Sequence, residues 1–180
     1  DGVLGGAGGG GALARAPLRA PLGAPPLQLE RMPPSFSLLT AALHSRRARC
    51  CGTPPLEPAL CLLCGTLLCA GPKCKRAASR GGGPAECTLH AAACGGGACL
   101  FFLVHQGVVL LVDGGRAAYH GSIYLDAHGE EDRGLRRGKP LYLNAARIAE
   151  LAALWRAHGV PLEVARARAS ASTLIPLEYF

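Results

Sequence analysis

The sequence has few aromatic residues: they make up 5% of its 180 residues, with a single Trp. Large side chains that could anchor a core are therefore scarce. It also lacks a long apolar run, because the most apolar stretch, residues 98–112, is too short to span a bilayer and is interrupted by His105-Gln106-Gly107. No membrane segment is expected, and the length suits one domain with a modest core.

A secretory signal peptide is also missing, and the chain begins at Asp1 without an initiator Met, which is typical of a piece of a longer protein. The nine cysteines are an odd number, so the sequence does not predict a secreted disulfide framework. Reduced thiols in the cytoplasm, or in the nucleus, are expected instead. Clustered thiols in those compartments indicate metal binding.

Acidic residues are the minority charge, with 12 Asp and Glu against 19 Lys and Arg. Most of the basic excess lies in residues 1–90, and such an excess can indicate nucleic-acid or membrane binding. Here the arginines stand among Ala, Pro and Gly, without aromatic residues for base stacking. The sequence therefore predicts neither a nucleic-acid partner nor a membrane partner.

Three parts are expected along the chain. Residues 1–26 are a low-complexity linker, since seven of the first twelve residues are Gly. Residues 27–159 form the domain, and residues 160–180 are a tail. The expected elements are a helix over 35–44, an antiparallel meander with strands 100–104, 108–112 and 116–120, and a helix over 145–158 capped by Asn144 and packed on the meander. The predicted fold class is a small α+β domain stabilised by zinc.

The cysteine-rich segment, residues 59–99, contains two pairs with the spacing of metal ligands. Cys61 and Cys64 stand three positions apart and are followed by Gly65, and Cys87 and His90 repeat that spacing. Three thiolates and one imidazole make a closed tetrahedral site, which predicts a structural Zn²⁺ and no catalytic one. The Gly-rich residues 81–83 explain the long interval between the pairs.

Further cysteines leave other ligand sets open. Cys94 is the alternative for one position of the first site, and a possible additional ion would use Cys69, Cys74 and Cys94. Cys50 and Cys51 stand in an Arg-rich loop without a partner pattern and are interpreted as incidental. No activated nucleophile is evident, so no catalytic residue and no cofactor-binding residue besides the zinc ligands is predicted.

The segment from Tyr124 to Leu143 combines charges of both signs between short apolar ends. From Glu130 to Lys139 the charges nearly cancel, so the segment is a poor phosphate-binding patch. On physical grounds it is a solvated loop with local ion pairs, and it is also a candidate docking surface for another part of a larger protein.

This segment and Pro58-Ala-Leu-Cys-Leu-Leu-Cys-Gly65 resemble the extreme C-terminus of the UBR-type E3 ubiquitin ligases of the N-degron pathway, including PROTEOLYSIS6-like members. The resemblance runs from about Leu29 to His158 and includes Pro34-x-Phe36 and Cys94-Gly95. It implies a C-terminal cap, or autoinhibitory domain, that contacts the RING region of a parent ligase. The UBR box that binds N-degron substrates and the RING that recruits a ubiquitin-loaded E2 would lie elsewhere in that RING-type transferase.

Two departures from the family pattern stand out. Cys99 occupies a position where relatives carry Gly, so the resemblance does not make it a ligand. The helix after Leu143 lacks the Glu and Tyr expected at its start. Two other functions remain open on the sequence: a stand-alone zinc-dependent protein-interaction module and a zinc-finger nucleic-acid binder. A RING and a UBR box upstream would favour the ligase. A nucleic-acid affinity that falls steeply with salt concentration would favour the zinc-finger nucleic-acid binder.

Overall fold

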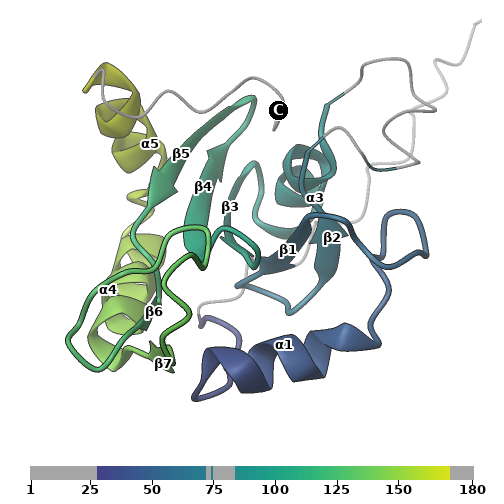
Figure 1. The fold of residues 1–180 in the computed structure, drawn as a ribbon. Helices are drawn as coiled ribbons and strands as arrows, with labels where there is room; N and C mark the ends of the chain where they lie inside the picture. The colour runs from purple at the N-terminus through teal and green to yellow at the C-terminus, as the bar shows by residue number, and fades with distance from the viewer. Residues whose placement is uncertain (1–27, 72–73, 75–83, 171–180) are drawn as a thin grey trace, which may run out of the picture.

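The computed structural model describes residues 28–71, 74 and 84–170. The fold is α+β, as predicted, with an antiparallel sheet surrounded by helices (Figure 1). The predicted linker over residues 1–26 lies outside the described part. Five strands form the main sheet in the order β2-β1-β3-β4-β5, with bounds Pro58–Cys61 (β1), Leu67–Cys69 (β2), Ala98–Leu103 (β3), Val108–Asp113 (β4) and Arg116–His120 (β5).

The predicted meander is confirmed as β3, β4 and β5. Leu100 pairs with Leu111, and the turn between the first two strands lies at the predicted Gly107, whose φ of +66° is a conformation that favours glycine. The Gly107 amide donates to the Leu103 carbonyl at 2.9 Å. Nearly every residue of β3 and β4 is buried, so both faces of the sheet are covered.

The sequence did not predict β1 and β2, which extend the sheet beyond β3. β1 pairs with β3 on one side and with β2 on the other, and Cys61 stands opposite Phe101. These strands are three and four residues long, and their continuous apolar composition shows no alternation. The hairpin places the Cys61-x-x-Cys64 turn at the end of the main sheet.

Helix α1 (Phe36–His44) confirms the first predicted helix: the Ser35 hydroxyl accepts from the Leu38 amide, and Leu39 and Leu43 are buried. Helix α3 (Glu86–Cys94) was not predicted and contacts β2, β3 and β4. It carries the second cysteine–histidine pair. The cysteine-rich segment is therefore a hairpin followed by a helix.

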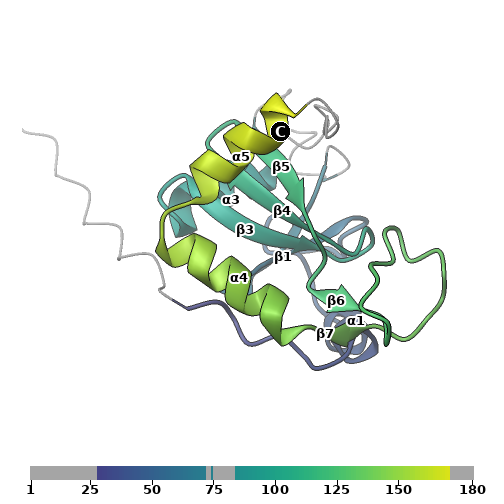
Figure 2. The ribbon, with the colours of Figure 1, turned by 90° about the vertical axis from the view of Figure 1, so that its left-hand side faces the viewer.

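The structure has two C-terminal helices where the sequence predicted one. α4 (Ala145–Arg156) begins at the predicted cap, where Asn144 Oδ1 accepts from the Arg147 amide, and it buries Leu151 and Trp155. The helix that lies across β4 and β5 is α5 (Val160–Ala169), in residues that the sequence analysis assigned to a tail (Figure 2). Pro161 lies in the first turn of α5, where its missing N–H costs nothing.

Three of the scarce aromatic residues gather where α1 meets the sheet. The ring of Tyr124 lies 5.6 Å from that of Phe36 and 5.4 Å from that of Phe102, and its hydroxyl donates to the Pro33 carbonyl at 2.8 Å. Tyr124 begins β6 (Tyr124–Leu125), which pairs with β7 (Tyr142–Leu143) in a separate two-stranded sheet. This pairing closes the charged loop of residues 126–141 at its base.

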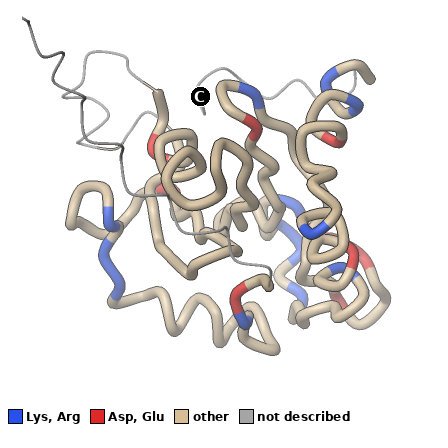
Figure 3. The backbone as a smooth tube through the Cα atoms, turned by 180° about the vertical axis from the view of Figure 1, so that it is seen from behind, with Lys and Arg blue, Asp and Glu red and all other residues tan. Residues whose placement is uncertain are grey.

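Charged residues lie mainly on the periphery of the molecule. Figure 3 shows them on the loop after α1, on the charged loop and along α4 and α5. Within the described part of the chain, none of the helices has the length and apolar character needed to cross a membrane.

Candidate metal centre

Cysteine and histidine side chains of the described residues gather in two groups. We name them the hairpin–helix site and the loop–hairpin site. In each, one ligand atom per residue lies within 4.8 Å of every other. The hairpin–helix site consists of Cys61, Cys64, His90 and Cys94, and the loop–hairpin site consists of Cys50, Cys51, Cys69 and Cys74.

The β1–β2 hairpin presents two sulfurs of the hairpin–helix site. Cys61 is the last residue of β1, and its amide donates to the Thr66 carbonyl at 2.9 Å. Gly65, at φ +66°, donates from its amide to the Cys61 carbonyl at 3.0 Å. This tight turn brings Cys64 back beside Cys61, which explains why a glycine follows the second cysteine.

Helix α3 supplies the other two side chains. His90 and Cys94 are four residues apart and so share one face of the helix. His90 Nε2 lies 3.3 Å from Cys64 Sγ, close to the roughly 3.6 Å expected for two ligands of one tetrahedral zinc. The hairpin and the helix thus point four ligand atoms at a common centre.

Three of the four predicted ligands come together in this site: Cys61, Cys64 and His90. The fourth member of the group is Cys94, and Cys87 belongs to neither group. Cys87 is buried in the first turn of α3, and seven residues of helix place it about 10 Å along the axis from Cys94. One ion at the C-terminal end of α3 cannot easily reach both.

The predicted additional set of Cys69, Cys74 and Cys94 is divided between the two sites. Cys94 joins the hairpin–helix site, whereas Cys69 and Cys74 lie with Cys50 and Cys51. The last two had been interpreted as incidental because no pair spacing surrounds them. The loop after α1 brings them to β2 through long-range contacts that spacing does not reveal.

Cys99 also lies close to the hairpin–helix site without belonging to its four-membered group. It is fully buried in β3, with its Sγ 3.6 Å from Cys61 Sγ. A hydrogen bond from Cys99 lowers the pKa of the Cys61 thiol to about 4, and the same contact raises the pKa of Cys99. Cys99 therefore lies against a proposed ligand and shifts the pKa of that ligand.

The chemistry of this donor set suits zinc. Thiolate and imidazole are the ligands of structural zinc, and four of them fill a tetrahedron. Every position would then be taken by a protein atom, with none left for water or substrate.

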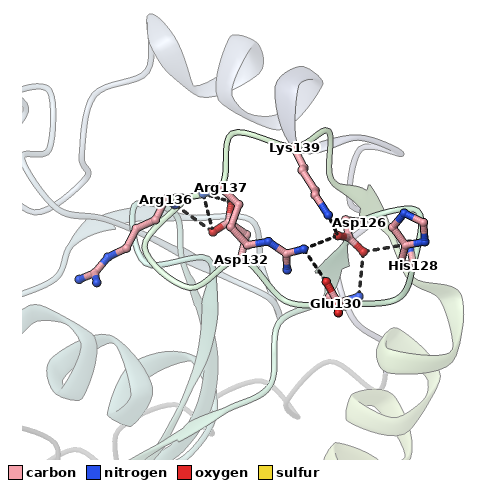
Figure 4. A network of polar contacts seen from close by, with 7 residues as sticks. All are labelled: Asp126, His128, Glu130, Asp132, Arg136, Arg137 and Lys139. Atoms are coloured by element: carbon pink, nitrogen blue, oxygen red, sulfur yellow. Dashed lines mark hydrogen bonds and ion pairs between the residues drawn. The ribbon is translucent and has the colours of Figure 1, made fainter.

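The charged loop is held by two carboxylates with different partners (Figure 4). Asp126 Oδ1 accepts from the amides of His128 and Glu130, both at 2.9 Å. Asp126 Oδ2 lies 3.1 Å from Arg137 Nη2 and 3.4 Å from Lys139 Nζ. These contacts tie both ends of the loop to one buried carboxylate, in agreement with the predicted local ion pairs.

Asp132 organises the middle of the same loop. Its carboxylate is buried and accepts from the amide of Arg136 at 2.9 Å, and its Oδ2 accepts from the amide of Arg137 at 2.9 Å. Leu135 has a φ of +53°, a conformation that leucine rarely adopts. The hydrogen bonds of Asp132 to the next two residues stabilise this conformation. The loop is a defined structure, because Asp132 fixes its middle through backbone amides while the Arg137 side chain reaches the buried carboxylate of Asp126 (Figure 4).

Comparison with known proteins supplies the decisive observation. The sequence profile described as Proteolysis_6 C-terminal matches residues 12–157, which is most of the chain. The chain belongs to this family. Its similarity to curated relatives is spread over the same region: it is 42% identical to E3 ubiquitin-protein ligase ubr3 of Danio rerio over 73% of the chain, 39% identical to UBR3 of Homo sapiens over 72%, and 37% identical to UBR1 of Mus musculus over 78%.

The family assignment confirms the resemblance that the sequence motifs indicated, namely a C-terminal domain of the UBR type. The chain spans only 7–8% of the length of these relatives. The Proteolysis_6 C-terminal region is thus a small part of a far longer protein in each of them.

One prediction concerns the charged loop of this Proteolysis_6 C-terminal chain. Hydrogen bonds from backbone amides, the Glu130 amide first, lower the pKa of Asp126 to about 2. Because its unfolded value is near 4, the stabilisation by Asp126 is fully present above about pH 4 and is lost as the pH falls towards 2. At pH 7, Asp126→Asn should therefore loosen the loop and accelerate amide hydrogen exchange at His128 and Glu130.

The matched control is Glu150→Gln, the equivalent change at an exposed carboxylate of α4. It should leave exchange in the loop unchanged. Equal exchange rates in Asp126→Asn and in the unsubstituted protein at pH 7 would show that the carboxylate does not order the loop.

Proposed function

We propose that this chain is the C-terminal structural and regulatory domain of an E3 ubiquitin-protein ligase of the N-degron pathway. The observation that carries the proposal is the family match: the chain aligns over about three quarters of its length with proteins named E3 ubiquitin-protein ligase. The transferase activity would belong to the RING-type parent protein. The domain itself would contribute no catalytic group.

We further propose that the domain binds a structural Zn²⁺ through Cys61, Cys64, His90 and Cys94. Cys94 replaces Cys87 in the set predicted from the sequence, because only Cys94 lies with the other three ligand atoms. A closed tetrahedron of three thiolates and one imidazole supports a structural role and disfavours metal-based catalysis. The ion would hold the β1–β2 hairpin against α3.

The partners would be other regions of the parent ligase, foremost its RING region, and indirectly a ubiquitin-loaded E2 and N-degron substrates. The charged loop supports a protein contact, because its backbone is fixed by Asp126 and Asp132 and its charges nearly cancel. Cysteines that are all free thiols support a reducing compartment, the cytoplasm or the nucleus.

The test uses the full-length ligase with substitutions in this domain. Ubiquitin transfer to an N-degron peptide is measured with purified E1 and E2, together with the affinity for the peptide. Cys94→Ser should lower the transfer rate at least about 10-fold, because it removes a zinc ligand that stabilises this domain. The peptide affinity should be unchanged, because the peptide would bind in another domain of the ligase. Cys99→Ala, a neighbouring cysteine outside the ligand set, should retain the rate of the unsubstituted ligase.

Two results would overturn this function. One is discharge of a ubiquitin-loaded E2 by the isolated chain, which would make the domain itself catalytic. The other is a Cys94→Ser ligase that has lost its zinc yet transfers ubiquitin at the unsubstituted rate. The second result would still support zinc binding by the domain, but it would show that ubiquitin transfer by the ligase does not depend on the bound zinc.

A further inference from the structure

The loop–hairpin site brings together four thiols from three separate segments. Cys50 and Cys51 lie in the turn region after α1, Cys69 ends β2, and Cys74 follows β2 along the chain. None of them belongs to the hairpin–helix site, and the function proposed above uses none of them. Tertiary folding brings these four cysteines together, since the two residues of a contacting pair are up to 24 positions apart in the sequence.

The distances between the sulfurs have the scale of a metal site. Cys51 Sγ lies 3.7 Å from Cys69 Sγ, and Cys50 Sγ lies 3.7 Å from Cys74 Sγ. Two sulfurs bound at about 2.3 Å to one tetrahedral zinc lie roughly 3.8 Å apart. The two measured pairs share no residue, and all four sulfurs lie within 4.8 Å of one another. The group could therefore hold one metal ion.

A backbone contact and the mutual orientation of the sulfurs favour thiolate ligands over incidental packing. Cys50, Cys69 and Cys74 are buried, and the Cys69 amide donates to Cys50 Sγ at 3.4 Å. An N–H group aimed at a sulfur stabilises its charged, metal-binding form. Cysteines that serve only as small apolar side chains would not need to point at one another.

The turn that presents Cys50 and Cys51 is held by backbone hydrogen bonds. The amide of Ala48 donates to the Thr53 carbonyl at 2.9 Å, and that of Gly52 donates to the Ala48 carbonyl at 2.8 Å. Gly52 has a φ of +69°, so the turn relies on glycine there. The amide of Arg49 then ties the turn to β2 by donating to the Leu67 carbonyl at 2.8 Å.

The charge of the loop is complementary to such a site. Four thiolates around a divalent ion carry a formal net charge of −2. Arg46, Arg47 and Arg49 immediately precede the first two cysteines, and Figure 3 shows these residues as a basic stretch at the end of α1. This basic stretch suits an all-thiolate site, since cations near a zinc–thiolate centre offset its charge.

We propose that the domain binds a second structural Zn²⁺ ion through Cys50, Cys51, Cys69 and Cys74. The all-sulfur donor set selects a soft, tetrahedral ion, which distinguishes it from the hairpin–helix site with its imidazole ligand. The second ion fastens the loop after α1 to the outer strand of the sheet. This inference is independent of ligase function, because it concerns only the folding of this chain.

The first experiment counts ions in the zinc-loaded, reduced chain by native mass spectrometry. The expected result is two zinc ions per chain. A count of one, with that ion lost in Cys94→Ser, would overturn the second site and leave the first intact.

The second experiment identifies the ligands by Co²⁺ substitution, because charge-transfer absorption reports cobalt–thiolate bonds. Cys51→Ser is the chosen variant, since Cys51 is only partly buried and its loss should leave the fold intact. It should weaken Co²⁺ and Zn²⁺ binding at the second site by about 100-fold or more, given that even residues outside the coordination shell are worth 10–100-fold.

Cys87→Ser is the matched control, because Cys87 is a buried cysteine outside both groups. It should leave the affinities of both sites unchanged. If Cys87→Ser abolishes the second site and Cys51→Ser does not, the proposed ligand set is wrong. If Cys51→Ser fails to fold, the ion count of the unsubstituted chain alone decides whether a second site exists.

Discussion

Replacement of Cys61 by Ser is expected to unfold the domain and to release zinc from the hairpin–helix site. Cys61 is fully buried, ends β1 and lies beside Phe101 of β3, so its sulfur connects the centre of the sheet to the proposed ion. Apparent binding energies of structural zinc are on the order of 10–16 kcal/mol. Whole domains are stable by only about 5–15 kcal/mol.

The measurement is thermal unfolding followed by circular dichroism, with the zinc content determined on the same samples. Cys99→Ala is the matched control, because Cys99 is equally buried and its sulfur lies only 3.6 Å from that of Cys61. As a residue outside the ligand set it should cost about 1–2 kcal/mol and retain the metal. A cooperatively folded, zinc-loaded Cys61→Ser protein would contradict the proposed site.

Acid should have the same effect as the substitution, since zinc ligands must be deprotonated to bind. Release of the ion should begin as the pH falls below neutrality and protons compete for His90 and the thiolates. This transition lies above the pH range in which Asp126 is protonated. Loss of metal and loss of the loop contacts can therefore be separated along one titration.

The second large effect is expected from Gly95→Ala. Gly95 follows Cys94 at the end of α3, and a Cβ at this position would lie 1.8 Å from the carbonyl oxygen of Ala98 and 3.2 Å from the ring of Trp155. The first contact is with backbone, which cannot rotate away. The start of β3 or the end of α3 must move, and we expect a destabilisation of about 3 kcal/mol.

Zinc affinity should fall together with stability in this variant, because the displaced residue adjoins the ligand Cys94. Gly115→Ala in the turn before β5 is the matched control, since a Cβ there has no heavy atom within 4 Å. It should change stability by less than about 0.5 kcal/mol. An equal loss in both variants would show that the close approach at Gly95 does not constrain the fold.

The parts of the fold that were predictable are those whose local patterns agree with their packing. Ser35 caps α1, Asn144 caps α4, and glycine-containing turns separate β3, β4 and β5. The β1–β2 hairpin and α3 were hidden, because their sequences are short and dominated by cysteines. Helix α5 was missed because only Val160 and Val164 of its ten residues are buried, which is too few for a visible apolar stripe.

The candidate site was predictable to the extent that its ligands are close in sequence. The Cys61-x-x-Cys64-Gly turn has a local geometry that its spacing specifies. The choice between Cys87 and Cys94 depends on which end of α3 faces the hairpin, and that is decided by tertiary packing. The helical spacing of His90 and Cys94 was the available signal, but it has meaning only once the segment is known to be a helix.

The turn after α1 also protects the sheet from other chains. β2 is an outer strand with the apolar sequence Leu67-Leu68-Cys69, and strands of this kind are templates for aggregation when their backbone groups are free. Here the Leu67 carbonyl accepts from the Arg49 amide and the Cys69 amide donates to the Cys50 sulfur. The cysteine-bearing turn thus occupies backbone groups of the edge strand β2. A domain in which this turn detaches from β2 would be exposed to self-association as well as to unfolding.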